Sequence, residues 1–144
     1  MKILLDTSVL LPGFRYPGLE KKLIGRLLAE RITPVITDYI VEELGENIRE
    51  HYTEQEKAIA LDLLLELLKL GVLEVKVWEH YSENINEASQ YVPEKDTPIL
   101  AAIMLPDIDL FITKDEKHFT KNQKLRNTPW QAKIKHINEY LAES

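Results

Sequence analysis

The stretch MKILLDTSVLL, residues 1–11, opens with an apolar run of strand length that stops at Asp6 and resumes directly after it. A continuous apolar run of this kind is typical of a strand buried on both faces of a parallel sheet. The carboxylate is out of place in a segment that otherwise indicates buried core. We expect Asp6 to close this strand at the edge where its carboxyl end meets solvent.

The rest of the chain alternates between strand and helix patterns. Further strand patterns occur at PVIT (34–37), VLEVKVW (72–78), DLFIT (109–113) and AKIKHI (132–137). Helical patterns lie between them: at 19–31, after Asp38 as an N-cap, at 53–70 between a Thr53/Glu56 capping box and Gly71, at 84–91, and around Pro98. This alternation predicts an α/β fold with a central, mostly parallel sheet and helices on both faces.

Length and composition limit the function further. At 144 residues the chain has room for one domain, which we take to be residues 1–144. It contains no cysteine, which excludes disulfides, zinc-thiolate sites and thiol nucleophiles. The first apolar stretch is too short to span a membrane, and no signal-peptide pattern follows, so we expect a cytoplasmic protein. The net charge of -6 argues against broad binding to nucleic-acid backbones, although Lys and Arg outnumber acids between residues 114 and 136.

The predicted helix at 53–70 is apolar around most of its circumference. Asp62, Glu66 and Lys69 form only a narrow polar stripe. A helix on the outside of a small α/β domain needs one apolar face. The surplus therefore indicates either a helix wedged between two others or, as we favour, an interface with a second chain, for which a homodimer is the simplest arrangement.

Four carboxylates stand at element ends or on an early helical turn among apolar neighbours: Asp6, Glu43, Asp96 and Asp115. Three have ordinary alternative roles, because Asp96 could be an N-cap, Glu43 a solvated helical residue and Asp115 the start of a turn, whereas capping explains Asp6 only if Thr7 starts a helix. Together they would converge at the carboxyl edge of the sheet, where ligands bind in such folds. Their mutual repulsion would raise their pKa values unless a cation compensates, and oxygen ligands suit Mg²⁺ or Mn²⁺.

Other α/β functions lack their required residues. A receiver-type phosphoacceptor domain needs an adjacent acid pair after the first strand, and a dehalogenase-type phosphatase needs Asp-x-Asp, whereas this chain has Asp6-Thr7-Ser8. Neither the Rossmann nor the P-loop glycine signature is present. The four histidines, at positions 51, 80, 118 and 136, are scattered, and we expect each to be a surface or packing residue.

The patterns LLDTSVLL, IVEEL, KDTPILAA and FITKD occur in the order and spacing in which PIN-domain ribonucleases carry their acidic quartet. The chain resembles this family over nearly its full length, and single short PIN domains are similar to the VapC-like toxins of type II toxin-antitoxin pairs. The resemblance places the quartet on Asp6, Glu43, Asp96 and Asp115, with Glu43 chosen over its neighbour Glu42. Ser8 stands where many members have asparagine.

The resemblance implies a three-layer α/β/α fold and hydrolysis of phosphodiester bonds in single-stranded RNA with one or two Mg²⁺ or Mn²⁺ ions. The four acids would be catalytic and metal-binding residues, supported by Thr7, Ser8 and Thr113. Basic residues would contact RNA, for which the candidates are Arg15, Lys114 and Lys117, and Phe14 and Tyr16 could stack on bases. Expected partners are RNA and an antitoxin protein. An RNA-processing nuclease, or a non-catalytic module that binds RNA or protein, stays open as an alternative.

Overall fold

The computed structural model describes residues 1–10, 19–69 and 71–143. Arg15, Phe14 and Tyr16, which we expected to contact RNA, lie outside the described residues. None of the helices in the described ranges combines the length and the apolar composition that a membrane-spanning segment needs.

The described strands form one five-stranded sheet. They are β1 (Lys2–Leu5), β2 (Thr33–Thr37), β3 (Glu74–Lys76), β4 (Leu110–Thr113) and β5 (Ile134–His136), in the order β3-β2-β1-β4-β5. Each neighbouring pair is parallel. The prediction of a mostly parallel α/β sheet is confirmed. Because β1 is the middle strand, the residue that follows it lies at the centre of the sheet's carboxyl edge.

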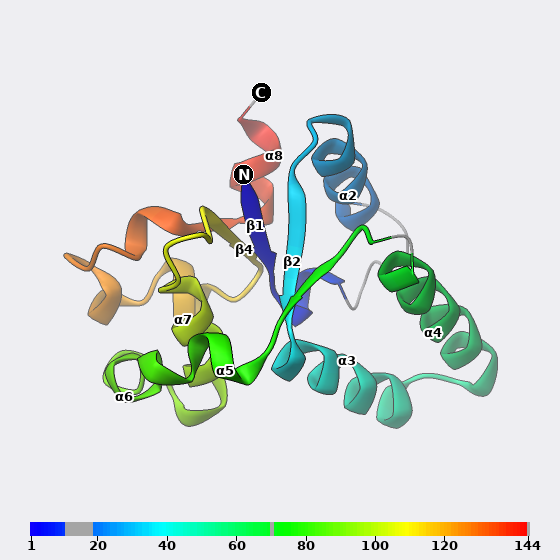
Figure 1. Ribbon diagram of the computed structural model, residues 1–144, viewed down its shortest axis with the longest axis horizontal. Coiled ribbons are helices and arrows are strands. Elements are labelled where there is room, and N and C mark those ends of the chain that lie inside the picture. The colour runs from blue at the N-terminus through cyan, green and yellow to red at the C-terminus, as the bar shows by residue number, and fades with distance from the viewer. Residues whose placement is uncertain (11–18, 70, 144) are drawn as a thin grey trace.

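Helices cover both sides of the sheet, as Figure 1 shows with α2 and α4 on one side of the strands and α5, α6 and α7 on the other. The longer helices are α2 (Leu19–Ala29), α3 (Asp38–His51), α4 (Glu54–Lys69) and α7 (Thr97–Ile103). The shorter ones are α5 (Trp78–Tyr81), α6 (Ile85–Ala88) and α8 (Ile137–Ala142), with single turns at Ser82–Asn84, Glu94–Asp96, Glu116–Thr120, Gln123–Leu125 and Gln131–Lys133. This is the three-layer arrangement that the resemblance implied.

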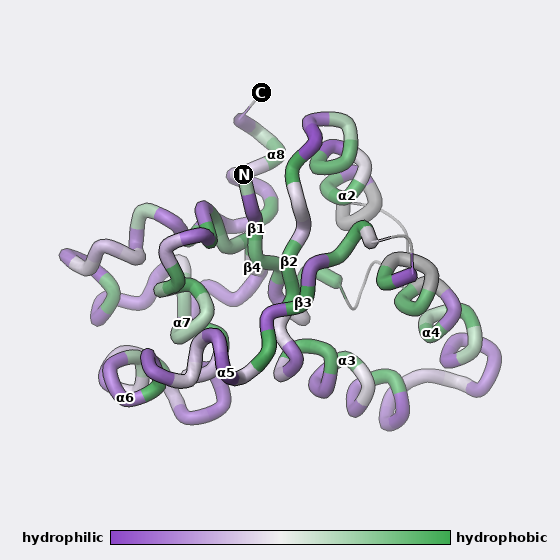
Figure 2. The backbone as a smooth tube through the Cα atoms, in the orientation of Figure 1, coloured by the Kyte–Doolittle hydropathy of each residue, from purple (hydrophilic) through white to green (hydrophobic). Residues whose placement is uncertain are grey.

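The core explains the unbroken apolar run of β1. Ile3, Leu4 and Leu5 are all fully buried, so side chains on both faces of the strand are covered. Figure 2 shows hydrophobic residues along the central strands and hydrophilic residues on the outer side of α3. A strand enclosed in this way fixes the backbone of the residue that follows it.

Two predicted element boundaries differ from the structure near α3 and α5. The N-cap of α3 is Thr37, whose buried hydroxyl accepts a hydrogen bond from the Ile40 amide at 3.0 Å, so the prediction that Asp38 caps this helix is wrong. The Asp38 carboxylate instead accepts the amides of Tyr39 and Trp78 and the hydroxyl of Tyr81. It ties α5 to α3, and this is why the strand expected at 72–78 gives way to a helix at Trp78.

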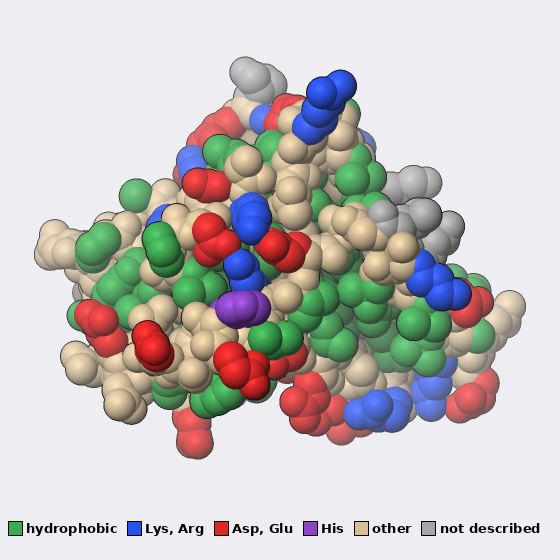
Figure 3. Space-filling model, viewed as in Figure 1, with side chains coloured by type: hydrophobic (Ala, Val, Ile, Leu, Met, Phe, Trp, Pro, Cys, Tyr) green, Lys and Arg blue, Asp and Glu red, His purple; other side chains and the backbone are tan. Residues whose placement is uncertain are grey.

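The long helix α4 begins at the predicted capping box. Thr53 Oγ1 accepts from the Glu56 amide at 3.2 Å, and Glu56 Oε1 accepts from the Thr53 amide at 3.0 Å. Along its described side chains Ala60 and Leu64 are buried, whereas three large apolar residues are about half exposed: Ile59 (56%), Leu61 (45%) and Leu65 (53%). The space-filling view shows apolar side chains gathered on this face of the molecule between α3 and α4 (Figure 3).

Candidate active site

Asp6 is held rigidly where β1 ends. It is only 6% exposed, and its amide donates to the Ile112 carbonyl of β4 at 3.1 Å. One carboxylate oxygen, Oδ1, accepts the Thr7 amide at 2.8 Å. The other, Oδ2, accepts the hydroxyls of Ser8 at 2.8 Å and Thr113 at 2.7 Å. The predicted supporting residues Ser8 and Thr113 therefore both bind the predicted central acid.

Glu43 reaches the same edge from α3. Its Oε1 accepts the Thr7 hydroxyl at 3.1 Å, which places it one residue from Asp6. The neighbouring Glu42 is exposed on the outside of the helix. The one-residue ambiguity in the sequence is thus decided by helix geometry, because consecutive helical residues point about 100° apart and only one of them can face the sheet.

Asp115 follows β4 and begins a single helical turn. Its amide donates to Thr113 Oγ1 at 2.9 Å, so Thr113 connects it to Asp6. Its Oδ1 accepts the His118 amide at 3.0 Å as the N-cap of the turn Glu116–Thr120. Asp115 therefore starts a turn and is also connected to Asp6 through Thr113.

Asp96 occupies the N-cap position of α7, but its carboxylate makes no capping hydrogen bond. Asp96 is 6% exposed, and its Oδ2 is buried and accepts no hydrogen bond within the described part of the chain. The simple N-cap alternative therefore does not account for it. A buried carboxylate oxygen that accepts no hydrogen bond lowers the stability of the fold, and a cation bound here would offset that loss.

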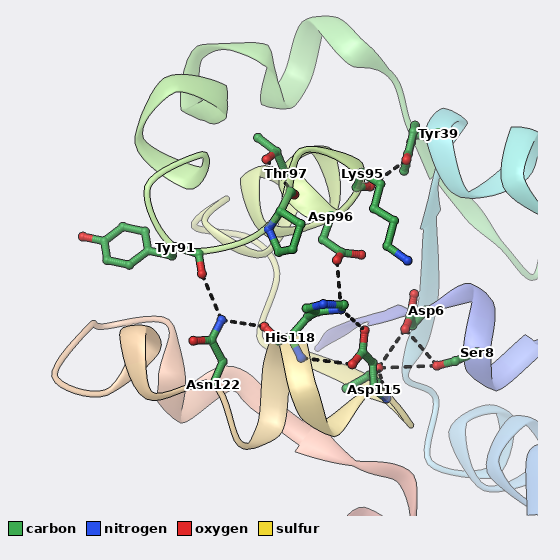
Figure 4. Close-up of polar contacts among 12 residues, drawn as sticks. Asp6, Ser8, Tyr39, Tyr91, Lys95, Asp96, Thr97, Asp115, His118 and Asn122 are labelled. Carbon is green, nitrogen blue, oxygen red and sulfur yellow. Dashed lines mark hydrogen bonds and ion pairs between the residues drawn. The ribbon is translucent and has the colours of Figure 1, made fainter.

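His118 was missed by the sequence analysis, which expected a surface or packing residue. Its Nδ1 lies 3.0 Å from Asp115 Oδ2 and 3.2 Å from Asp96 Oδ2, so the ring bridges the two acids (Figure 4). Asp96, Asp115 and His118 form the one tight group of potential metal ligands in the described ranges, with their ligand atoms within 4.8 Å of one another. The only feature of the sequence that could have indicated this role is the position of His118 three residues after Asp115, in a one-turn helix.

Burial and mutual repulsion raise the pKa values of three of the acids. Burial is the main cause for Asp6 and Asp96, and in both the charge of Asp115 adds to it. Burial also raises the pKa of Glu43 to about 7, with Asp6 and Asp96 contributing and the Thr7 hydroxyl opposing. These shifts are those of carboxylates gathered in one place without enough positive charge.

One basic residue lies near the acids in addition to the two expected lysines that the structure describes. Lys114 follows β4, and its amide donates to Ser8 Oγ at 3.0 Å, while Lys117 is exposed on the turn after Asp115. Lys95, which the sequence analysis did not name, adjoins Asp96. Its positive charge opposes the rise in the pKa values of Asp96 and Glu43 without reversing it. In Figure 4 its side chain extends toward Asp6.

The donor set fits a divalent cation. The acids present carboxylate oxygens, which suit Mg²⁺ and Mn²⁺, and one of these oxygens lacks a hydrogen-bond donor in the described residues. His118 adds one imidazole nitrogen to the tight group. Asp96, Asp115 and His118 could hold an ion directly. Asp6 and Glu43 are not part of this tight group but interact electrostatically with Asp96, and they could act through water, since Mg²⁺ keeps several waters in its shell.

Comparison with known proteins agrees with this geometry. A family model described as a PIN domain matches residues 2–117, whereas the curated proteins contain no match. Among solved structures, a chain in the crystal structure of VapBC2 from Rickettsia felis, bound to a DNA fragment from their promoter, superposes with a TM-score of 0.67. The two are 17% identical over 94% of this chain and 98% of that chain, a likeness that shows the fold. Because the family model covers most of the sequence, the chain belongs to the PIN-domain family.

Proposed function

We propose that the protein is a metal-dependent ribonuclease that hydrolyses phosphodiester bonds in single-stranded RNA. The observation that carries the proposal is the tight group of Asp96, Asp115 and His118, whose ligand atoms lie within 4.8 Å of one another. In it the buried Oδ2 of Asp96 accepts no hydrogen bond from the described residues and lies 3.2 Å from His118 Nδ1. A fold maintained only for stability gains nothing from such a group. A nuclease would gain from it, because a cation held there would be available to a scissile phosphate.

The chain's own groups have separable roles in this reaction. The metal, when bound, supplies a Lewis acid that polarises the phosphate and lowers the pKa of a coordinated water. Asp6, Asp96 and Asp115 would hold and orient it, and Ser8 and Thr113 fix the Asp6 carboxylate through hydrogen bonds of 2.8 and 2.7 Å. Glu43, whose pKa is raised to about 7, is suited to accept a proton from the attacking water near neutral pH.

His118 and the lysines complete the arrangement. His118 orients Asp115 through both its amide and its ring nitrogen, so it acts on the metal site even if it is not itself a ligand. Lys114 and Lys117 lie at the same edge and would contact RNA phosphates. Positive charge here offsets the overall charge of -6, which otherwise repels a polyanion.

Cleavage of a labelled single-stranded RNA, with and without Mg²⁺ or Mn²⁺, tests the proposal. We expect Asp6→Asn to lower kcat/KM on the order of 1,000-fold, because charge stabilisation by a metal contributes several kcal/mol to the transition state. Glu43→Gln should also lower the rate, whereas Glu42→Gln, one residue away and exposed, is the matched control.

The proposal fails if the wild-type protein cleaves no single-stranded RNA with either metal, or if Asp6→Asn cleaves as fast as the wild type. Binding of RNA without cleavage would favour the alternative of a non-catalytic PIN-like module. Cleavage confined to a precursor RNA, with no growth defect on expression, would favour an RNA-processing enzyme.

We further propose that the protein, a single domain over residues 1–144, acts in the cytoplasm as the toxin of a toxin-antitoxin pair. The support is the fold that this protein shares with a chain in the VapBC2 structure. Expression of the chain alone should slow growth, and co-expression of a small protein encoded beside it should restore growth. Normal growth on expression would contradict the toxin role without affecting the nuclease proposal.

The exposed apolar residues of α4 support the proposed homodimer. Leu61 and Leu65 lie four residues apart on one face of α4, and both are about half exposed within the described part of the subunit. We expect a dimer by sedimentation, and a monomer after Leu61→Lys and Leu65→Lys together. A wild-type monomer at micromolar concentration would contradict this arrangement.

A further inference from the structure

A pocket lies next to Asp96, whose neighbours in the chain, Lys95 and Thr97, both line it. It has a volume of about 850 Å³ and is formed where the start of α3, the start of α5, α6 and the start of α7 meet. Its lining residues are Tyr39, Trp78, Ile85, Ser89, Val92, Pro93, Glu94, Lys95, Thr97 and Pro98. Most of these are apolar or aromatic, with few polar groups, which is the composition of a site for a flat organic group rather than for an ion.

The aromatic residue at the rim of this pocket is held in place. Trp78 is 49% exposed, yet its amide donates to Asp38 Oδ2 at 2.8 Å. Its ring packs edge-to-face on Tyr81, with centroids 5.6 Å apart, and the Tyr81 hydroxyl also binds Asp38. An exposed tryptophan with a fixed backbone and a buried aromatic neighbour provides a platform whose stacking surface loses little entropy on binding.

A single turn connects the pocket to the acids. Glu94 and Lys95 of the turn Glu94–Asp96 line the pocket, as does the next residue, Thr97. Asp96, between them, contacts His118 instead. Tyr39 fixes the turn because its hydroxyl donates to the Lys95 carbonyl at 2.6 Å. The Lys95 side chain extends from this turn toward Asp6 (Figure 4). An RNA strand with one phosphate at the acids would have to pass Lys95 to place a base in the pocket.

We propose that the pocket between Tyr39, Trp78 and Pro98 binds one unstacked base of the RNA strand, next to the phosphodiester that is cut, while Lys95 contacts the phosphate between them. The inference rests on the proposed nuclease function and adds a specificity-determining site to it. Aromatic side chains bind splayed bases of single-stranded RNA by stacking, and a lysine at the boundary matches the negative charge of the backbone.

The chemistry of the lining favours a base over a protein side chain. The pocket offers two aromatic residues, a serine hydroxyl and one charge of each sign at Glu94 and Lys95. Hydroxyl and carboxylate groups can bind the edge of a heterocycle, whose faces meet the apolar walls. Continuity with the acids through Asp96 further indicates that the occupant is part of the same molecule whose phosphate reaches the metal.

Cleavage of oligonucleotides that carry a single abasic site at successive positions tests the proposal. In the wild type, one abasic position beside the cut should lower kcat/KM about tenfold, because stacking of one base contributes roughly that factor or more. Trp78→Ala should lower kcat/KM for the intact oligonucleotide by a similar factor and should show no further loss at that abasic position. Trp78→Phe should retain most of the wild-type rate.

The matched control is Leu28→Ala, a truncation of a similarly exposed apolar residue on α2. It should leave both kcat/KM and the abasic profile unchanged. Equal rates for Trp78→Ala and the wild type on intact RNA, or losses from Trp78→Ala and the abasic site that add fully, would overturn the base pocket while leaving the nuclease function intact.

Fluorescence separates failure of the pocket from failure of the nuclease. The chain has two tryptophans, so Trp130→Phe leaves Trp78 as the only one. We expect quenching of Trp78 by an intact single-stranded oligonucleotide in EDTA and much weaker quenching by the oligonucleotide with the abasic site. If the wild type cuts no RNA but the intact oligonucleotide still quenches Trp78 more than the abasic one, only the nuclease proposal fails. If the wild type cuts no RNA and the two oligonucleotides quench Trp78 equally, the base pocket fails as well.

Discussion

Two groups of carboxylates lie on the same sheet in opposite electrostatic states. One group, which we call the ion cluster, consists of Lys2, Glu74, Lys76 and Asp107. Lys2 Nζ lies 2.9 Å from Glu74 Oε1 and 3.4 Å from Asp107 Oδ2, and Lys76 pairs with the same Asp107 oxygen. These lysines, Lys76 first, hold the pKa of Asp107 below its usual value. In the acid site of Asp6, Glu43, Asp96 and Asp115, the pKa values of the first three are raised instead.

The difference shows which carboxylates serve the fold. Each acid of the ion cluster has a lysine beside it, and although Glu74 Oε2 is also buried without a hydrogen bond from the described residues, its partner oxygen is neutralised by Lys2. The acid site has His118 between two acids and Lys95 nearby, which does not bring the pKa values down. Uncompensated acids at a sheet edge lower stability, and their presence supports the proposed cation-dependent role.

Metal binding should produce the largest difference between the two groups. At free Mg²⁺ or Mn²⁺ 100-fold above Kd, the free energy of unfolding should rise by about 2.7 kcal/mol, which corresponds to a melting temperature roughly 5 to 10 °C higher. EDTA should reverse the shift. Thermal unfolding of Asp115→Asn should show little response to metal, whereas Asp107→Asn should respond as the wild type does.

The acid site should also make the metal-free protein less stable as pH rises. Glu43 binds its proton more tightly in the folded state, where its pKa is about 7, than in the unfolded chain, where it is 4.5. Its contribution is therefore fully present below pH 4.5 and is lost as pH rises through 7, a decline of about 1 to 2 kcal/mol. Urea unfolding in EDTA at several pH values measures this, and Glu43→Gln should flatten the profile while Glu42→Gln should not.

Asp96→Asn should stabilise the metal-free protein. Removal of a charge from a buried oxygen that lacks a donor in the described structure should raise the free energy of unfolding by roughly 1 kcal/mol. The same variant should lose cleavage activity. A destabilised Asp96→Asn in EDTA would show that His118 already compensates the charge of Asp96.

The smallest effect belongs to the ion cluster. Asp107→Asn should lower the free energy of unfolding by about 0.5 kcal/mol, because its pairs with Lys2 and Lys76 are partly exposed and surface pairs contribute little. The loss should shrink in high salt and should not depend on Mg²⁺. A loss that changes with metal would indicate that the two groups are coupled through the sheet.

Much of the fold could be predicted because its signals are local. The apolar runs at β1 and β4, the Thr53/Glu56 capping box and the proline in the first turn of α7 each act through neighbours in the chain. The N-cap of α3 could not be assigned in this way. Thr37 and Asp38 are both good capping residues, and the choice depended on Trp78 and Tyr81, which bind Asp38 from about 40 residues away.

The sequence by itself determined the residue types of the site and their order along the chain, because parallel strands must present their carboxyl ends at one edge. Only the tertiary structure decided which atoms meet. It placed Glu43 rather than Glu42 beside Thr7, left Asp96 Oδ2 without a hydrogen bond from the described residues, and inserted His118 between Asp96 and Asp115. These outcomes depend on distances between segments up to about a hundred residues apart, which composition and spacing do not encode.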